Sequence, residues 1–436
     1  MPFLRPFEVR LSGRNSPDRG RLRSCGDGAA RQRRRLMPSL VMLAASLIPA
    51  GAGLAQEDPL KWLPPGSTVQ TTLSERPARW IRAEMQGGTM GYMARLGELA
   101  FRSPLTLGRE AARRGLSCDA CHPNGAANVR FFVPGASDRP GNVDVTHREF
   151  HFREDDGIDN PVNIPSLRGV RLTAPYGHDG RVASLRDFSR HVIMNEFGGP
   201  EIEPWLLDAL VAYQQQLALP PRPDTGDEAA DARRAAYRDH CADCHGDDDA
   251  LPPPARHDIG TGGFFEPPAV FGLAESAPYL HDGSAPTLRA AVAAHRDPPP
   301  AEALEPILDW LQAARAVTRR FDPETPAGDL ARLLGFLEVL EQPLLDEDFV
   351  RADLIADMVA MEVGRVHRRY RPEATDAREA TRSWAKDLKQ VTAFAREGRF
   401  PEARAALAAL GEAMEAALPQ LESAQGLSLY AATAAD

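Results

Sequence analysis

Cys118-Asp-Ala-Cys121-His122 places two thiols three positions apart, with an imidazole directly after the second thiol. The same arrangement returns later in the chain as Cys241-Ala-Asp-Cys244-His245. This spacing is typical of a c-type haem attachment site, in which each thiol bonds to one vinyl group and the His approaches the iron from one face. We therefore expect two covalently bound c-type haems, with His122 and His245 as proximal iron ligands.

Two other chemistries could use the same thiols. Zinc can be held by two Cys-x-x-Cys pairs, and two plain disulfides would also consume four cysteines. Neither explains why a His follows both second cysteines. The fifth cysteine, Cys25, falls in a segment that we expect to be removed, so the mature chain would keep no spare thiol.

The N-terminal segment has the pattern of a secretory signal peptide. Residues 1–35 are rich in Arg, an apolar run extends from about Leu40 to Pro49, and Gly53-Leu54-Ala55 is a small-residue cleavage site. The apolar run is shorter than the ~20 residues of a membrane-spanning helix, so an uncleaved anchor is the weaker reading. We expect residues 1–55 to be removed, which would leave a mature chain without a stable membrane span. We expect that chain to be periplasmic, because c-type haem is attached outside the bacterial cytoplasm.

The charge of the expected mature chain argues against a nucleic-acid partner. Residues 1–55 carry 10 Arg and 3 acidic residues, so the remainder has 41 basic and 58 acidic residues and a net charge of −17. A nucleic-acid binder would present the opposite sign. The acidic balance would instead steer the protein toward basic partners.

A longer pattern is repeated after each haem motif. The first copy contains Ala174-Pro-Tyr-Gly-His-Asp-Gly180, and the second contains Ala277-Pro-Tyr-Leu-His-Asp-Gly283. In both copies a Pro precedes the Tyr by 11 positions and a Leu follows the last Gly after five. The chain therefore contains a duplication, with each copy downstream of its own haem motif.

The duplication predicts two small haem domains in tandem, covering residues 56–220 and 226–342. Helical apolar spacing at Trp205–Tyr213 is expected to close the first domain, and the same spacing at Leu330–Leu340 is expected to close the second. The Pro-rich stretch between Leu219 and Gly226 is expected to be a linker.

Residues 343–436 are expected to form a helical extension. Residues 347–371 and 374–422 have helical periodicity, with breaks at Pro372 and Pro401, which predicts three helices. A Met-bearing stripe that includes Met358 belongs to the core rather than to a haem. The extension would dock a redox partner or form a homodimer, and the sequence does not choose between these roles.

From about residue 90 to 342 the chain resembles the bacterial di-haem cytochrome c peroxidase family, including its MauG-like branch of protein-modifying enzymes. Leu96-Gly-Glu-Leu-Ala-Phe101-Arg-Ser-Pro104-Leu and Gly115-Leu-Ser-Cys118 are similar to the family's lead into its first haem motif. The two Ala-Pro-Tyr-x-His-Asp-Gly segments resemble its counterparts after each haem. The resemblance implies a mainly α fold, with two tandem class-I-type cytochrome c domains followed here by the helical extension.

The resemblance also implies where the sixth ligand of the second haem lies. His295 stands seven positions after Leu288, so two helical turns place both on one face. The family has its sixth ligand at this position, often Met or Tyr, and we expect His295 to take it. A surface His at a helix end is the alternative, and His281 is the competing ligand, although its Asp-Gly neighbours suggest a turn.

In the first unit the resemblance implies a haem with an open distal side. Glu196 matches a family Glu that assists proton movement as the O–O bond breaks, and a buried carboxylate could serve as acid and base. His191 complicates this assignment, because it could assist catalysis or bind the first iron. Met194, one turn later, could also bind the iron.

Two further positions concern the region between the haems. The family commonly has Trp immediately before the first Asp-Gly, where this chain has His178, and an imidazole is harder to oxidise than an indole. Tyr176 could substitute, but Tyr279 occupies the same place in the second copy, which suits a packing or hydrogen-bonding role for both residues equally well. Calcium is common between the haems in the family, and an acidic loop offers unassigned candidates: His147, Glu149, His151, Glu154, Asp155, Asp156 and Asp159.

These observations predict a peroxidase that reduces hydrogen peroxide at the first haem, with electrons supplied by a small redox protein and passed through the second haem. A non-enzymatic electron carrier is the first alternative, for which His191 argues. A MauG-like enzyme that oxidises a residue of a partner protein is the second. Neither alternative changes the expected haem attachment.

Overall fold

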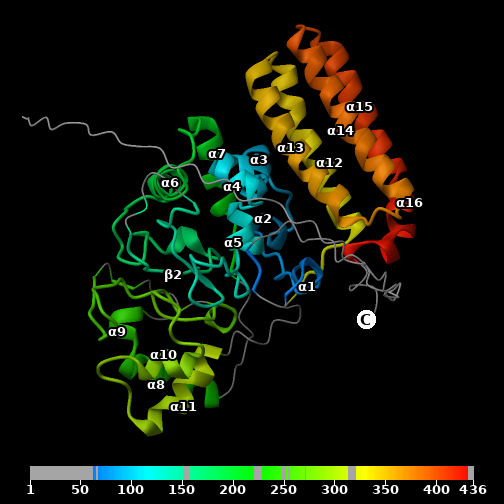
Figure 1. The fold of residues 1–436 in the computed structure, drawn as a ribbon. Coiled ribbons are helices and arrows are strands. Elements are labelled where there is room, and N and C mark those ends of the chain that lie inside the picture. Colours follow the sequence, from blue (N-terminus) through cyan, green and yellow to red (C-terminus); the bar gives the residue numbers. More distant parts are fainter. Residues whose placement is uncertain are drawn as a thin grey trace, which may run out of the picture. The chain divides into compact units, whose positions relative to one another are not determined.

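The computed structural model describes residues 62–430 apart from residues 65–66, 151–154, 156, 220–227, 247–251, 254, 271 and 313–320. The expected signal peptide and most of the expected linker lie outside the described residues. The mainly α fold is confirmed (Figure 1). The described strands are β1 (Asn142–Val143) and β2 (Val162–Asn163), which pair antiparallel. No helix in the described part of the chain is long and apolar enough to cross a membrane.

The first haem unit, as we call the first expected haem domain (residues 56–220), is built on the packing of α3 (Tyr92–Arg102) against α7 (Pro204–Gln214). Gly97 permits this close approach, because a Cβ there would lie 1.9 Å from the carbonyl oxygen of Ala209. The rings of Phe101 and Tyr213 meet across the same pair of helices, with centroids 5.2 Å apart. The other helices of this unit are α1 (Val69–Ser74), α2 (Arg82–Met85), α4 (Arg109–Arg113), α5 (Cys118–Cys121) and α6 (Leu185–His191).

The second haem unit has its own apolar core, in which α8 (Glu228–His240) packs against α11 (Ala301–Gln312). Stacked rings of Tyr237 and Trp310, with centroids 3.9 Å apart, join the two helices. The helix that closes this unit is therefore α11, and the expectation that Leu330–Leu340 closes it was wrong. The remaining helices of the unit are α9 (Ala242–His245) and α10 (Leu288–Ala293).

Leu330–Leu340 lies in α12 (Pro326–Leu345), which packs with the helical extension instead. The three expected helices are present as α13 (Phe349–Arg369), α14 (Thr375–Arg396) and α15 (Phe400–Ala416), followed by a short α16 (Leu418–Ser423). α12 contacts α13, α15 and also α3, so the extension and the first haem unit share one continuous apolar core. Periodicity identified the helix correctly but could not identify what its apolar face packs against.

The duplicated segment has the same local structure in both copies. Gly169 and Gly272 both adopt the left-handed conformation (φ 74° and 66°), each directly before a short 3₁₀ turn. The hydroxyl of Tyr176 donates to the carbonyl of Val170, and that of Tyr279 donates to the carbonyl of Leu273. The two Tyr residues therefore brace equivalent turns, which supports their packing role.

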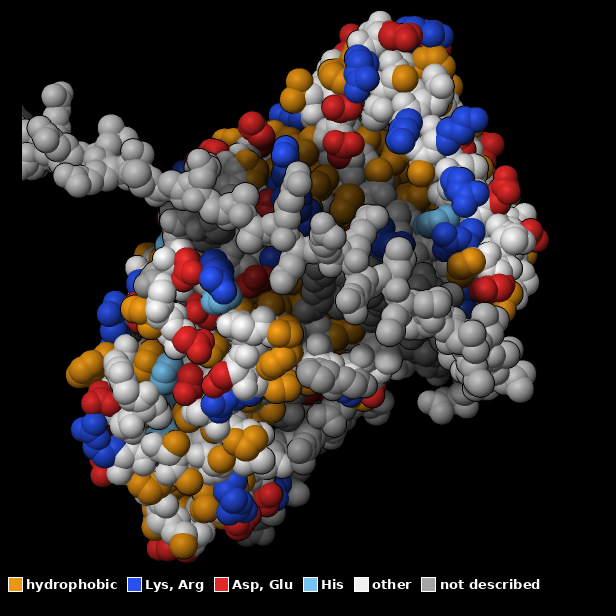
Figure 2. All heavy atoms as spheres, in the orientation of Figure 1, with side chains coloured by type: hydrophobic (Ala, Val, Ile, Leu, Met, Phe, Trp, Pro, Cys, Tyr) orange, Lys and Arg blue, Asp and Glu red, His pale blue; other side chains and the backbone are white. Residues whose placement is uncertain are grey.

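Charge is mixed on the surface of the described residues. Figure 2 shows acidic and basic side chains interspersed on the face that it draws. The negative net charge is therefore not gathered into one patch on that face.

Candidate functional site

Both Cys-x-x-Cys-His motifs line one continuous cavity. Its volume is about 1550 Å³, larger than the ~300–1,000 Å³ of a typical small-molecule pocket, so it has room for more than one large group. The motif residues on its wall are Cys118, Cys121, His122, Cys241, Cys244 and His245. The four cysteines are free thiols, and no group of three or more His, Cys, Asp or Glu in the described residues could hold a metal ion.

Each proximal His is oriented by a backbone carbonyl. The Nδ1–H of His122 donates to the carbonyl of Pro165 at 2.9 Å, and that of His245 donates to the carbonyl of Pro268 at 2.9 Å. Because a carbonyl only accepts, Nδ1 carries the proton and Nε2 keeps its lone pair for a metal. Burial lowers the pKa of His122 to about 4 and also lowers the pKa of His245, which keeps both rings neutral.

Pro165 and Pro268 are the residues at which the two repeat copies begin. Sequence reasoning used them only to measure spacing and missed their role as acceptors for the proximal imidazoles. Their equal distance from the following Tyr was the available signal. The repeat therefore begins at the carbonyl that orients the His of each motif, and the motif residues fit two c-type haems.

His295 lies beside His245 in the second unit. The two ring centroids are 6.2 Å apart, with the ring planes at 57°. Two imidazoles on opposite sides of one metal each place a nitrogen about 2 Å from it, which separates the ring centroids by roughly 6 Å. The Nδ1–H of His295 donates to the carbonyl of Ala291 at 2.9 Å, so its Nε2 is also left with a lone pair. His295 thus fits the sixth ligand position.

His281 is engaged elsewhere. Its ring stacks on that of Phe265, with centroids 3.9 Å apart and planes at 16°. Its carbonyl accepts the backbone N–H of Asn163 at 2.8 Å. These contacts give His281 a position between the two units instead of beside His245.

The corresponding helix of the first unit ends in an irregular turn that presents Glu196. α6 continues into a single π-helical turn, Val192–Glu196, a feature found frequently at functional sites. The Glu196 side chain is 15% exposed, and its Oε1 lies 3.5 Å from Nη2 of Arg181 and 3.9 Å from Nε2 of His191. Burial raises the pKa of Glu196, and the guanidinium of Arg181 opposes that rise.

Arg181 is a site residue that sequence reasoning missed. It lines the cavity, pairs with Asp179 at 3.0 Å and reaches Glu196. The available signal was the position directly after the first Asp-Gly, where the second copy has Ser284. A cation at this place makes the first unit electrically different from the second.

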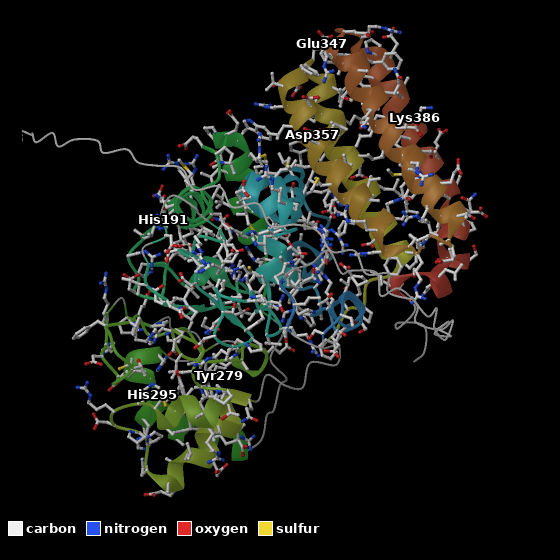
Figure 3. All side chains as sticks on the ribbon, in the orientation of Figure 1. His191, Tyr279, His295, Glu347, Asp357 and Lys386 are labelled. Atoms are coloured by element: carbon white, nitrogen blue, oxygen red, sulfur yellow. The ribbon has the colours of Figure 1, made fainter. Side chains whose placement is uncertain are left out.

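His191 and Met194 are separated by the structure. His191 lines the cavity, and its side chain is 39% exposed. Met194 packs against the apolar core and is not among the residues that line the cavity. This placement is against Met194 as an iron ligand. Figure 3 labels His191, the last residue of α6, and His295, which lies just after the end of α10.

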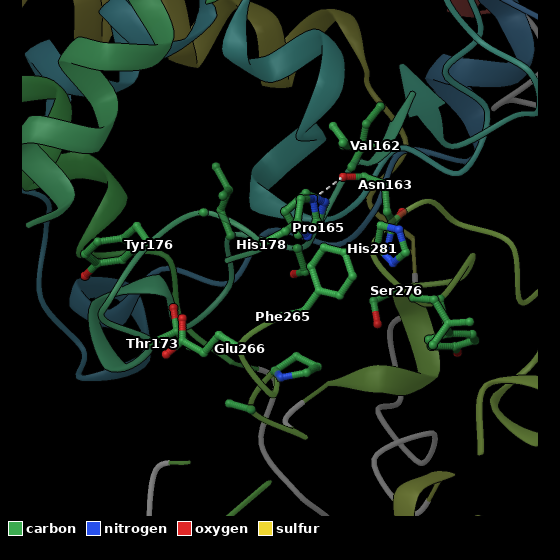
Figure 4. A pocket seen from close by; sticks show the side chains of 18 of the residues that line it. Val162, Asn163, Pro165, Thr173, Tyr176, His178, Phe265, Glu266, Ser276 and His281 are labelled. Atoms are coloured by element: carbon green, nitrogen blue, oxygen red, sulfur yellow. Dashed lines mark hydrogen bonds between the residues drawn. The ribbon is translucent and has the colours of Figure 1, made fainter. Parts of the chain in front are cut away.

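Asn163 connects the two repeat copies at their equivalent histidines. Its carbonyl accepts the Nε2–H of His178 at 3.1 Å (Figure 4). Its side-chain amide donates to the carbonyl of Pro278 at 2.9 Å. Its backbone N–H also donates to the carbonyl of His281, so Asn163 is hydrogen-bonded to both repeat copies. Burial lowers the pKa of His178 and of His281, so both rings are neutral near pH 7.

The acidic loop is described only in part. His151, Glu154 and Asp156 lie outside the described residues, whereas Asp155 and Asp159 are exposed. Glu149 pairs with Arg114 at 2.5 Å. Calcium binding by this loop therefore stays a prediction.

No protein-family model matches the chain, and no curated protein matches it. Among solved structures it is similar to Kuenenia stuttgartiensis hydrazine synthase pressurised with xenon, at 17% identity and a TM-score of 0.38, over 65% of this chain and 100% of that one. It is also similar to a MauG-like protein associated with microbial copper homeostasis, at 16% identity and a TM-score of 0.35, over 55% of this chain and 93% of that one. Likenesses this distant carry no argument about function, which therefore rests on the site itself.

Proposed function

We propose that this chain is an exported di-haem c-type cytochrome that reduces hydrogen peroxide, with electrons passed from the second haem to the first. The proposal is carried by the unequal surroundings of the two proximal histidines. His295 lies opposite His245, whereas among the residues that the structure describes no ring faces His122 in this way. A filled sixth position favours electron transfer and an open one favours reaction with a ligand.

The residues of the first unit suit peroxide chemistry. A haem held by Cys118, Cys121 and His122 would supply a redox-active iron at which peroxide can bind. Glu196 would accept a proton from one peroxide oxygen and return it to the other as the O–O bond breaks. Each turnover consumes two electrons and two protons and yields two waters.

Arg181 and His191 support the carboxylate in this proposal. Arg181 holds Glu196 at the cavity wall through their ion pair. Burial together with Arg181 lowers the pKa of His191, so its neutral ring can relay protons between Glu196 and solvent. The raised pKa of Glu196 keeps it available as a proton donor at higher pH than an exposed Glu.

The partners and location follow from the same proposal. The electron donor would be a small redox protein, and the net charge of −17 after residue 55 favours a donor with a basic docking face. Attachment of c-type haem requires export to the periplasm. A homodimer and a bound calcium ion remain part of the proposal.

The deciding experiment is an electron paramagnetic resonance spectrum of the oxidised protein, before and after addition of hydrogen peroxide. One high-spin and one low-spin ferric signal, with the high-spin signal lost on peroxide addition, is the expected result. Two low-spin signals unmoved by peroxide would overturn the peroxidase proposal.

An electron carrier is the second candidate, because His191 lines the cavity and could fill the sixth position of the first haem. The exposure of its ring and its proximity to Glu196 argue for the proton-relay role instead. A His191→Ala variant separates the two: a carrier would lose one low-spin signal, whereas the proposed peroxidase would keep its spin states.

A further inference from the structure

A network of buried and partly buried charged side chains connects the helical extension with the first haem motif. Its members alternate in sign and come from α3, α5, α12, α13 and the segments before α2 and α12. They are Arg76, Arg102, Asp119, Glu324, Asp329, Arg332, Glu362, Arg365 and Arg369. Charges are rarely this buried unless they are paired, so the network holds its members in fixed positions.

Asp119, which lies between the two haem-linking cysteines of the first motif, is the centre of the network on the haem side. Its carboxylate accepts from Nη2 of Arg76 at 2.6 Å and from Nη1 of Arg102 at 3.4 Å. It also accepts the backbone N–H of Asn124 at 3.2 Å. Asp119 therefore fastens the chain on both sides of His122.

Neighbouring positive charges keep the carboxyl group of Asp119 ionised. Burial opposes its ionisation, but the guanidiniums of Arg76, Arg102 and Arg365 outweigh burial and hold the pKa of its carboxyl well below the usual range. The carboxylate is 6% exposed, so solvent screens these interactions little.

The extension supplies the other side of the network from α13. Glu362, which is 4% exposed, accepts from Nε of Arg102 at 3.2 Å and from Arg365. Nη2 of Arg365 donates to the carbonyl of Arg102 at 3.5 Å, and its Nη1 lies 4.0 Å from Asp119. Two side chains of α13 thus reach the haem motif through Arg102.

Among the residues that the structure describes, no comparable ion-pair network reaches the second motif. Its acidic residue, Asp243, is exposed, and its unit has a separate apolar core. We propose that the helical extension is part of the first haem's binding site, in which Glu362 and Arg365 are positioning residues that act through Arg102 and Asp119 on His122. This inference rests on the haem-binding part of the proposed function and not on peroxide reduction.

Full-length Glu362→Gln, Arg365→Gln and Arg365→Lys variants test the inference, with Glu338→Gln as the matched control. Glu338 lies on α12 in the same helical module, and its side chain is 73% exposed. Three measurements do not depend on enzyme activity. They are the haem-to-protein ratio of each unit by peptide mass spectrometry, the reduction potential of each haem, and the electron paramagnetic resonance signal of the first haem.

We expect the glutamine variants to change the signal and potential of the first haem, or to lower its occupancy, while the second haem is unchanged. Arg365→Lys should recover part of the effect, because it keeps the charge but loses the planar fork. First-haem properties identical to those of Glu338→Gln would overturn the inference. Equal losses at both haems would also overturn it, since they would indicate general unfolding. If the unaltered protein does not reduce peroxide but the variants still show these first-haem effects, the peroxidase proposal alone is rejected.

Discussion

The imidazole rings of His245 and His295 stand 6.2 Å apart, with each Nδ1–H bonded to a backbone carbonyl. Each ring thereby keeps the lone pair of Nε2 for a metal. Replacement of His295 by Ala should therefore convert the second haem from low-spin to high-spin, as read from the absorption and electron paramagnetic resonance spectra. His191→Ala is the matched control, and the second haem should stay low-spin in it. An unchanged low-spin second haem in His295→Ala would show that another group is the sixth ligand.

Glu196 is expected to carry the proton transfer of peroxide reduction. Glu196→Gln keeps the shape of the side chain but removes the acid, so the rate of reaction with peroxide should fall by about 10²–10⁴-fold, with the haem spectra unchanged. Stopped-flow mixing with peroxide measures this rate. Glu201→Gln, at an exposed ion pair with Arg190, should react like the unaltered protein. Equal rates for the two variants would remove Glu196 from the mechanism.

His178 makes stability depend on pH. Burial lowers its pKa in the folded chain, so as the pH falls below about 6.5 the unfolded chain binds a proton first and the free energy of unfolding decreases. His178→Gln should therefore lose stability less steeply between pH 6.5 and 5 in urea titrations. The exposed His240 offers a His→Gln control that should retain the slope. Identical slopes for all three proteins would contradict this account.

The core of the helical extension should be sensitive to truncation. Trp384 on α14 is 1% exposed, and its replacement by Ala should lower the free energy of unfolding by about 3–5 kcal/mol in guanidinium titrations. Val350→Ala, at a side chain that is 76% exposed, should change it by less than about 0.5 kcal/mol. Similar losses in both variants would mean that Trp384 is not part of a packed core.

Local spacing predicted much of this molecule, because the relevant interactions lie within a few residues. The Cys-x-x-Cys-His motifs, the duplicated Tyr turns and the helices of the extension are features of this kind. Long-range packing was not predictable in the same way. α12 was assigned to the second haem unit because periodicity does not reveal the partner of an apolar face.

The same limit applied to charged residues. Glu362 and Arg365 have the spacing of an ordinary solvated pair on a helix, and only the fold brings them to Arg102, 260 positions from Glu362 in the chain. The ion pair between Arg181 and Glu196 was not predictable either, because it depends on the turn after the first Asp-Gly.

The separation of the apolar core around α3 and α12 from the core around α8 and α11 has a consequence for how the molecule opens. Leu99 in the first haem unit and Leu340 on α12 belong to one core, whereas Tyr237 and Ile307 belong to the other. Segments that share a core tend to open together as a cooperative unit. The part of the chain around α8 and α11 can therefore open briefly while the part around α3 and α12 stays closed, so slow hydrogen exchange should persist longest in α3 and α12.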